Sequence, residues 1–200
     1  MHGVEHRIAA VLVLTALFGL LSSSAAAEAQ NDERPSRTPD CVYVGTPYDV
    51  ATKMADLARP KKADLVCDPG CGDGRVLIMA AQRYGCRGTG YELDPRLANQ
   101  AMRIAKNRGV GDLVKVEVKD IFTVDYSNYD VVLIYLLPDM VLRLLPELET
   151  LKPGSRIVAH DYGIDGIEPD KSVSFISNED NVQHTVYLYT VPLKRSERQE

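Results

Sequence analysis

The stretch from Asp64 to Val76, with the sequence DLVCDPGCGDGRV, restricts the possible folds of this chain more than any other. A short apolar strand is expected over Leu65–Cys67, and it runs into an acid, Asp68. Three glycines at alternating positions follow: Gly70, Gly72 and Gly74. The apolar run 76–81 then predicts a helix. A strand, a glycine-rich turn and a helix form a nucleotide-binding crossover, because glycines permit a sharp turn close to a ligand and the helix N-terminus offers free N–H groups.

The spacing and charge of this loop indicate its ligand. The glycines fall as G-x-G-x-G and not as the G-x-G-x-x-G of dinucleotide-binding folds. Because Asp68 stands ahead of them, the loop suits a cationic ligand without phosphate better than a pyrophosphate. S-adenosylmethionine (SAM), which carries an ammonium and a sulfonium, is such a ligand.

Glu92 stands at the end of the second expected strand, Gly88–Glu92. In a doubly wound sheet, an acid at this strand end lies beside the glycine loop and can accept hydrogen bonds from both ribose hydroxyls of a nucleoside. Asp94 precedes a proline and a helical pattern, so it is expected to cap a helix and not to bind a ligand. Glu92 is therefore a candidate ribose-binding residue.

Asp120 follows the third expected strand, Val114–Lys119. An acid at this strand end, with apolar residues after it, is placed to hold the amino group of an adenine while Ile121 packs on the ring. We therefore add Asp120 and Ile121 to the candidate cofactor-binding residues.

The remaining pattern alternates strands and helices. Thr46 is expected to cap a first helix that starts at Pro47, and Pro146 is expected to break or kink a helix over 139–151. Further strands are expected at Asp130–Tyr135, Arg156–His160, Ser172–Phe175 and His184–Tyr189, the last two as an antiparallel pair. This order predicts a three-layer α/β/α sandwich with a mostly parallel, doubly wound sheet and a C-terminal antiparallel strand pair. Ligands of such a sheet bind beyond the carboxyl ends of its strands.

The N-terminal region predicts a targeting segment. Residues 1–29 contain an uncharged apolar run, 8–21, which is shorter than the roughly 20 residues of a membrane span but suits a signal-peptide core. A cleaved export signal, an uncleaved membrane anchor and a buried N-terminal helix all remain open. Residues 30–40 are polar and contain prolines, as in a linker, and 41–200 have the length of one domain. An exported or anchored enzyme would conflict with the cytosolic supply of SAM.

Charge and cysteine content narrow the partners. The formal net charge of −5 argues against unspecific nucleic-acid binding. The four cysteines contain no C-x-x-C pair, so neither a zinc site nor any other metal site is expected. Cys67 and Cys71 fall in a buried strand and in the glycine loop, which favours free thiols, and a Cys41–Cys86 disulfide is the one alternative.

Several motifs resemble those of class I, seven-stranded SAM-dependent methyltransferases. They are DPGCGDG (68–74), YELDP (91–95), Asp120-Ile121 and LKPG (151–154). YVGTP (43–47), GDGR (72–75), YLLP (135–138) and VAHD (158–161) more closely resemble a bacterial and mitochondrial family. Its mitochondrial members are protein-lysine methyltransferases of the inner membrane that act on the c-type ring protein of ATP synthase and on the adenine nucleotide carrier. The resemblance implies the fold and SAM, and a lysine as methyl acceptor. Pro69, where the family has leucine or glycine, and the apparent export signal depart from its pattern.

Methyl transfer from a sulfonium requires mainly in-line alignment and exclusion of water, because the methyl group is already activated. Tyr135, at the end of the fourth strand, is the first candidate for lining the acceptor site as a catalytic residue, and His160 and Asp161 are second candidates. Each also has a purely structural interpretation, as a core aromatic, a strand residue or a turn acid. YLLP stands where amino-methylating DNA enzymes carry an Asn/Asp-Pro-Pro-aromatic signature.

Three functions remain. The first is SAM-dependent methyl transfer to a lysine amine of a protein, with membrane proteins among the candidate substrates. The second is a nicotinamide-dependent oxidoreductase on a similar fold, which the glycine spacing disfavours. The third is a catalytically silent binding module with the SAM fold.

Overall fold

The computed structural model describes residue 35 and residues 37–196 of the 200-residue chain. The expected signal or anchor, 1–29, and the first part of the expected linker lie outside the described residues. In the part of the chain that the structure describes, no helix combines the length and the hydropathy needed to cross a bilayer.

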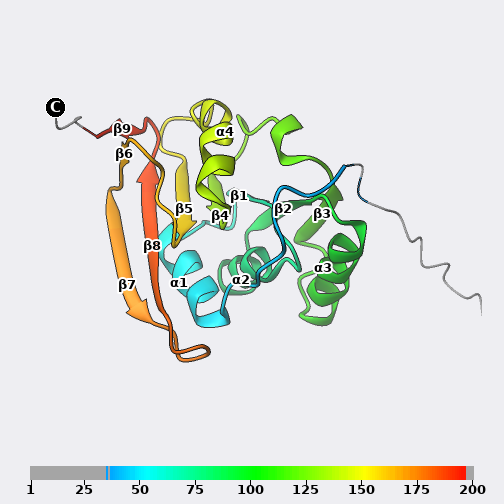
Figure 1. The fold of residues 1–200 in the computed structure, drawn as a ribbon. Helices are drawn as coiled ribbons and strands as arrows, with labels where there is room; N and C mark the ends of the chain where they lie inside the picture. Colours follow the sequence, from blue (N-terminus) through cyan, green and yellow to red (C-terminus); the bar gives the residue numbers. More distant parts are fainter. Residues whose placement is uncertain (1–34, 36, 197–200) are drawn as a thin grey trace, which may run out of the picture. The chain divides into compact units, whose positions relative to one another are not determined.

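A seven-stranded sheet with the order β3-β2-β1-β4-β5-β8-β7 forms the centre of the fold (Figure 1). Its strands are β1 Leu65–Pro69, β2 Arg87–Glu92, β3 Val114–Val118, β4 Val131–Ile134, β5 Arg156–His160, β7 Lys171–Ile176 and β8 Gln183–Thr190. Strands β1 to β5 pair in parallel, whereas β8 is antiparallel to both β5 and β7. The predicted sheet and its C-terminal antiparallel pair are thus confirmed. A separate two-stranded pair, β6 Ile167–Glu168 and β9 Lys194–Arg195, was not expected.

Helices cover both faces of this sheet, as the predicted sandwich requires. Helices α1 Tyr48–Ala58, α2 Arg75–Tyr84 and α3 Pro95–Asn107 pack on one face, and α4 Pro138–Leu148 packs on the other (Figure 1). The side chains of β4 alternate between the two cores: Val131 and Leu133 face α1 and α2, and Val132 and Ile134 face α4. All four are buried, which explains why β4 is apolar throughout.

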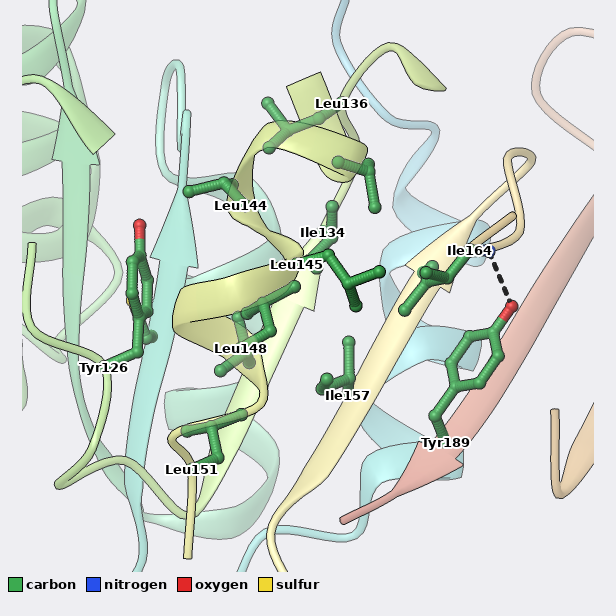
Figure 2. Close-up of a cluster of buried hydrophobic side chains, with 14 of the residues drawn as sticks. Tyr126, Ile134, Leu136, Leu144, Leu145, Leu148, Leu151, Ile157, Ile164 and Tyr189 are labelled. Atoms are coloured by element: carbon green, nitrogen blue, oxygen red, sulfur yellow. Dashed lines mark hydrogen bonds between the residues drawn. The ribbon is translucent and has the colours of Figure 1, made fainter. Parts of the chain in front are cut away.

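The core beneath α4 positions the segment that follows β4. Leu144, Leu145 and Leu148 of α4 lie over Ile134 and Ile157 of the sheet (Figure 2). At its edge, the Tyr189 hydroxyl accepts a hydrogen bond of 2.9 Å from the backbone N–H of Ile164. Because α4 starts four residues after β4 ends, this packing also fixes Tyr135 and Leu136 at the carboxyl end of the sheet.

Two expectations about helix ends were wrong. Pro47, not Thr46, is the N-cap of α1, and no side chain caps it. Thr46 is instead buried with its hydroxyl 3.4 Å from the Nδ1 atom of His160. Pro146 lies inside α4, which continues to Leu148. The hydrogen bond that proline cannot donate would go to the carbonyl of Leu142, an exposed residue, so water can replace it.

The topology creates a crevice at the carboxyl end of β1. The chain leaves β1 for β2 and β3 on one side and returns to β4 on the other. Ligands of open α/β sheets bind where the strand order reverses in this way.

Candidate active site

The glycine loop adopts a backbone that only glycine tolerates easily. Gly70, Gly72 and Gly74 have φ angles of 73°, 55° and 76°. A Cβ atom on Gly72 would lie 2.2 Å from the Tyr43 ring, and one on Gly70 would lie 2.8 Å from Leu136. The loop is therefore enclosed by side chains from both the segment before α1 and the segment after β4.

The Glu92 carboxylate connects the end of β2 to this loop. It accepts hydrogen bonds from the backbone N–H groups of Gly72 at 2.9 Å, Leu93 at 2.7 Å and Asp94 at 2.9 Å. These bonds fix both carboxylate oxygens beside the loop. Asp94 itself accepts a bond of 2.8 Å from the N–H of Arg96 as the N-cap of α3, which confirms its expected capping role.

Asp68, at the end of β1, has an unsatisfied oxygen. The residue is 5% exposed, and its Oδ2 atom has no hydrogen-bond partner among the residues that the structure describes. Burial raises the pKa of this carboxyl to about 8, against a backbone hydrogen bond from Leu77 that lowers it, and Glu92 and Asp73 add repulsion. A buried carboxyl with a free oxygen suits a cationic group of a ligand.

Two adjoining cavities join these acids. The larger has a volume of about 580 Å³, and Glu92, Leu97, Asp120 and Ile121 are among its lining residues. The smaller, of about 30 Å³, is lined by Asp68. Four residues line both: Tyr43, Val44, Gly70 and Tyr135. The structure thus brings together all the predicted cofactor-binding positions, and places Tyr135 where the two cavities meet.

Residues 37–44 line the larger cavity, although the sequence predicted a linker up to residue 40. The Nε atom of Arg37 donates a hydrogen bond of 2.7 Å to Asp120, and Arg37 also pairs with Asp40. The Arg37 guanidinium lowers the pKa of the Asp120 carboxyl. The sequence contained no sign of this contact, because the two residues are 83 positions apart.

Arg75 holds the entrance segment against the loop. It forms an ion pair of 2.7 Å with Asp73 and donates a hydrogen bond of 3.0 Å to the carbonyl of Thr46. Its guanidinium also lies 5.0 Å from the centre of the Tyr48 ring. The GDGR motif therefore positions the chain before α1 as well as the glycine loop.

Tyr135 contacts a group of aromatic and acidic residues at the ends of β5 and β8. Its ring centre lies 4.0 Å from that of His160 and 6.5 Å from that of Tyr162, whose ring is nearly parallel. Burial raises the pKa of the Tyr135 hydroxyl, and Asp161 adds to the effect, so the hydroxyl keeps its proton at neutral pH. The predicted acceptor candidates Tyr135, His160 and Asp161 thus lie together.

His184, which sequence reasoning missed, completes this group. Its Nδ1 atom lies 2.9 Å from the Nε2 atom of His160 and 2.9 Å from the Oδ2 atom of Asp161. Burial lowers the pKa of His160 to about 4, so it is neutral at pH 7. Burial also opposes protonation of His184, but hydrogen bonds to Asp161 and Asp180 raise its pKa above the ordinary value.

The four cysteines are free thiols, as favoured from the sequence, and the alternative Cys41–Cys86 disulfide is not formed. Cys41 is exposed, and the other three are buried. Burial raises the pKa of the Cys67 and Cys71 thiols, so these side chains contribute packing and not reactivity.

The residues present fit SAM. The free oxygen of Asp68 matches an ammonium, the Glu92 carboxylate matches a pair of ribose hydroxyls, and Ile121 supplies an apolar wall for a base. When bound, SAM supplies a methyl group activated by its sulfonium. The chain's own contribution is to orient that group toward Tyr135 and to exclude water from the junction of the cavities.

Comparisons with known proteins agree with this geometry. Residues 68–171, more than half of the chain, match the model of the ANTKMT methyltransferase domain. A protein-lysine N-methyltransferase of Saccharolobus islandicus is 35% identical over 78% of this chain and 97% of its own length. A human lysine N-methyltransferase, named for its action on the c-type ring protein of ATP synthase, is 33% identical over 68% of this chain, which spans 60% of that protein.

A solved structure adds the cofactor. The crystal structure of an RNA methyltransferase from Salinibacter ruber, in complex with S-adenosyl-L-homocysteine, superimposes with a TM-score of 0.68 at 39% identity. It covers 78% of this chain and 98% of that chain. The cofactor of the present chain is SAM, and the chain belongs to the SAM-dependent methyltransferases that carry the ANTKMT methyltransferase domain.

Proposed function

We propose that this chain transfers the methyl group of SAM to the side-chain amine of a lysine in a protein. The observation that carries the proposal is the surroundings of Tyr135. Its ring meets the cofactor cavities on one side and the Tyr162 and His160 rings on the other, with the Asp161 carboxylate nearby. Aromatic faces and a carboxylate attract a long cationic side chain such as lysine.

Tyr135 has a defined role in this proposal. A lysine ammonium must lose a proton before its nitrogen can attack a methyl group. The Tyr135 hydroxyl, which stays protonated because burial raises its pKa, can accept an N–H of the neutral amine through its oxygen and so direct the nitrogen lone pair toward the cofactor. The names of the archaeal and human relatives support lysine as the acceptor.

A Tyr135→Phe variant is expected to lower turnover by up to about tenfold, since one neutral hydrogen bond contributes roughly 0.5–1.5 kcal/mol. The affinity for SAM should remain close to that of the wild type, because the bond acts mainly in the transition state. Steady-state kinetics and calorimetry with SAM test the two expectations separately. Equal turnover in the variant and the wild type would remove Tyr135 from the acceptor site.

The substrate proposal is tested by incubating the chain with radiolabelled SAM and three separate acceptor pools: membrane proteins, soluble proteins and total RNA. We expect label on lysine, located by mass spectrometry of the labelled protein. The Salinibacter ruber relative makes RNA the most informative control, although the net charge of −5 does not favour a polyanion. Label on RNA alone would refute the lysine acceptor and leave the cofactor assignment intact.

We also propose that the first about 27 residues direct the chain to a membrane, because the apolar run 8–21 meets signal-peptide criteria. Cell fractionation and N-terminal sequencing of the mature chain distinguish the outcomes. A new N-terminus near residue 28 or 30 would indicate a cleaved signal, and an intact membrane-bound chain would indicate an anchor. An intact chain in the soluble fraction would contradict the proposal.

A further inference from the structure

Three potential metal ligands converge where β5 and β8 meet at the carboxyl end of the sheet. The Nε2 atom of His160, the Nδ1 atom of His184 and the Oδ2 atom of Asp161 form a triangle. Its sides measure 2.9 Å between the two histidines, 2.9 Å from His184 to Asp161 and 3.2 Å from His160 to Asp161. Ligand atoms that share one ion at about 2.0–2.2 Å lie roughly 3–3.5 Å apart, so the triangle needs little adjustment to hold an ion.

The other nitrogen of each imidazole has the partner that a metal-bound histidine requires. The Nε2 atom of His184 lies 3.1 Å from the Oδ2 atom of Asp180, and the Nδ1 atom of His160 lies 3.4 Å from the hydroxyl of Thr46. Such outer contacts hold the proton on the far nitrogen and leave the near nitrogen free to bind a metal. Both rings therefore present their unprotonated nitrogen to the centre of the triangle.

The third ligand is held in place by its backbone. Asp161 has a φ angle of 58°, a left-handed conformation that is uncommon outside glycine, and its Oδ1 atom accepts a hydrogen bond of 3.0 Å from the N–H of Thr185. Its second oxygen, Oδ2, is thereby directed to the two imidazoles. Sparsely populated backbone conformations of this kind concentrate at functional sites.

We propose that His160, Asp161 and His184 bind one divalent transition-metal ion, and that zinc is the ion their donors suit. Two imidazoles and a carboxylate form a common zinc ligand set that leaves a further coordination position for water. The His160 and His184 side chains are almost fully buried and that of Asp161 is 27% exposed, so the ion would enter past the carboxylate. The site lies beside the ring of Tyr135. Ion binding does not depend on the identity of the methyl acceptor.

Metal binding is tested on the full chain, freed of metal with a chelator and then titrated with zinc. We expect about one bound ion per chain after dialysis and a higher melting temperature in the presence of zinc. Cobalt substitution should give the weak visible bands of nitrogen and oxygen ligands, without the strong near-ultraviolet absorption of thiolate ligands. The cobalt spectrum therefore separates this site from Cys41.

Matched variants locate the site. His184→Gln and Asp161→Asn should abolish zinc binding, and Asp180→Asn, which changes only an outer contact, should weaken it roughly 10- to 100-fold. Replacing His2 and His6, the two other histidines of the chain, should leave the bound ion in place. Circular dichroism checks that each variant is folded. If the wild type retains no more zinc than folded Asp161→Asn or Asp180→Asn, the proposal is refuted and the group is a hydrogen-bond network.

Discussion

A Glu92→Ala variant is expected to bind SAM at least about a hundred-fold more weakly than the wild type. The carboxylate is placed to accept hydrogen bonds from two ribose hydroxyls, and a hydrogen bond to a charged group contributes roughly 1.5–3 kcal/mol, so two bonds contribute about 3 kcal/mol or more. The same side chain accepts three backbone N–H groups, including that of Gly72. Its removal therefore also loosens the glycine loop. Calorimetry with SAM measures the loss.

Controls for this variant separate binding from folding. Glu92→Gln keeps the size of the side chain and one accepting oxygen, so we expect it to fall between the wild type and Glu92→Ala. Thermal melting without ligand shows whether each variant is folded before its affinity is interpreted. The wild type should bind S-adenosyl-L-homocysteine and should not respond to NADH. A folded Glu92→Ala chain with wild-type affinity would exclude Glu92 from the cofactor site.

SAM binding is expected to strengthen about tenfold for each pH unit between pH 6 and pH 7.5. The buried Asp68 carboxyl has a pKa of about 8 in the ligand-free chain, so in this range it carries a proton. An ammonium pairs with the ionised carboxylate, and that proton must leave before the pair forms. Because the ionised fraction rises about tenfold per unit below the pKa, affinity must rise with pH and not fall. The upper limit keeps the ligand amine, with a pKa of about 7.7–8.0, mostly protonated.

An Asp68→Asn variant removes this dependence. The amide cannot ionise, so its affinity for SAM should be constant from pH 6 to pH 7.5. Leaving one partner of a buried ion pair alone costs about 3 kcal/mol or more, but the wild type itself must first deprotonate. The difference between the two chains should therefore be largest at pH 7.5 and shrink toward pH 6. Their melting temperatures at pH 6 should agree, because protonated Asp68 and asparagine are both neutral. Parallel pH profiles of the two chains would contradict this role of Asp68.

The local elements of the fold could be predicted from the sequence. The glycine loop is recognisable because positive φ angles at Gly70, Gly72 and Gly74 are a property of single residues. The fifth strand, Arg156–His160, has the predicted bounds, and Asp94 caps α3 as expected. Each of these features depends on interactions within a few residues. The order of the parallel strands then follows from the alternation of strands and helices.

The same local rules failed where distant contacts compete with them. Thr46 is a good capping residue, but its side chain is buried against His160, 114 positions away, and Pro47 begins α1 instead. Pro146 was expected to interrupt a helix, but α4 packs so extensively on the sheet that it continues past the proline. In both cases, packing outweighs an intrinsic preference of about 1 kcal/mol for a cap or about 3 kcal/mol for a proline.

What the sequence determined by itself is the cofactor half of the site, because Asp68, Glu92 and Asp120 each follow a recognisable strand of a parallel sheet. Only the tertiary structure decided the acceptor half and its surroundings. His184 meets His160 because β8 lies antiparallel to β5, with His160 opposite Val186, and Arg37 meets Asp120 across 83 positions. Such contacts depend on strand order and register, which are determined by the packing of the whole chain and not by the residues adjacent in sequence.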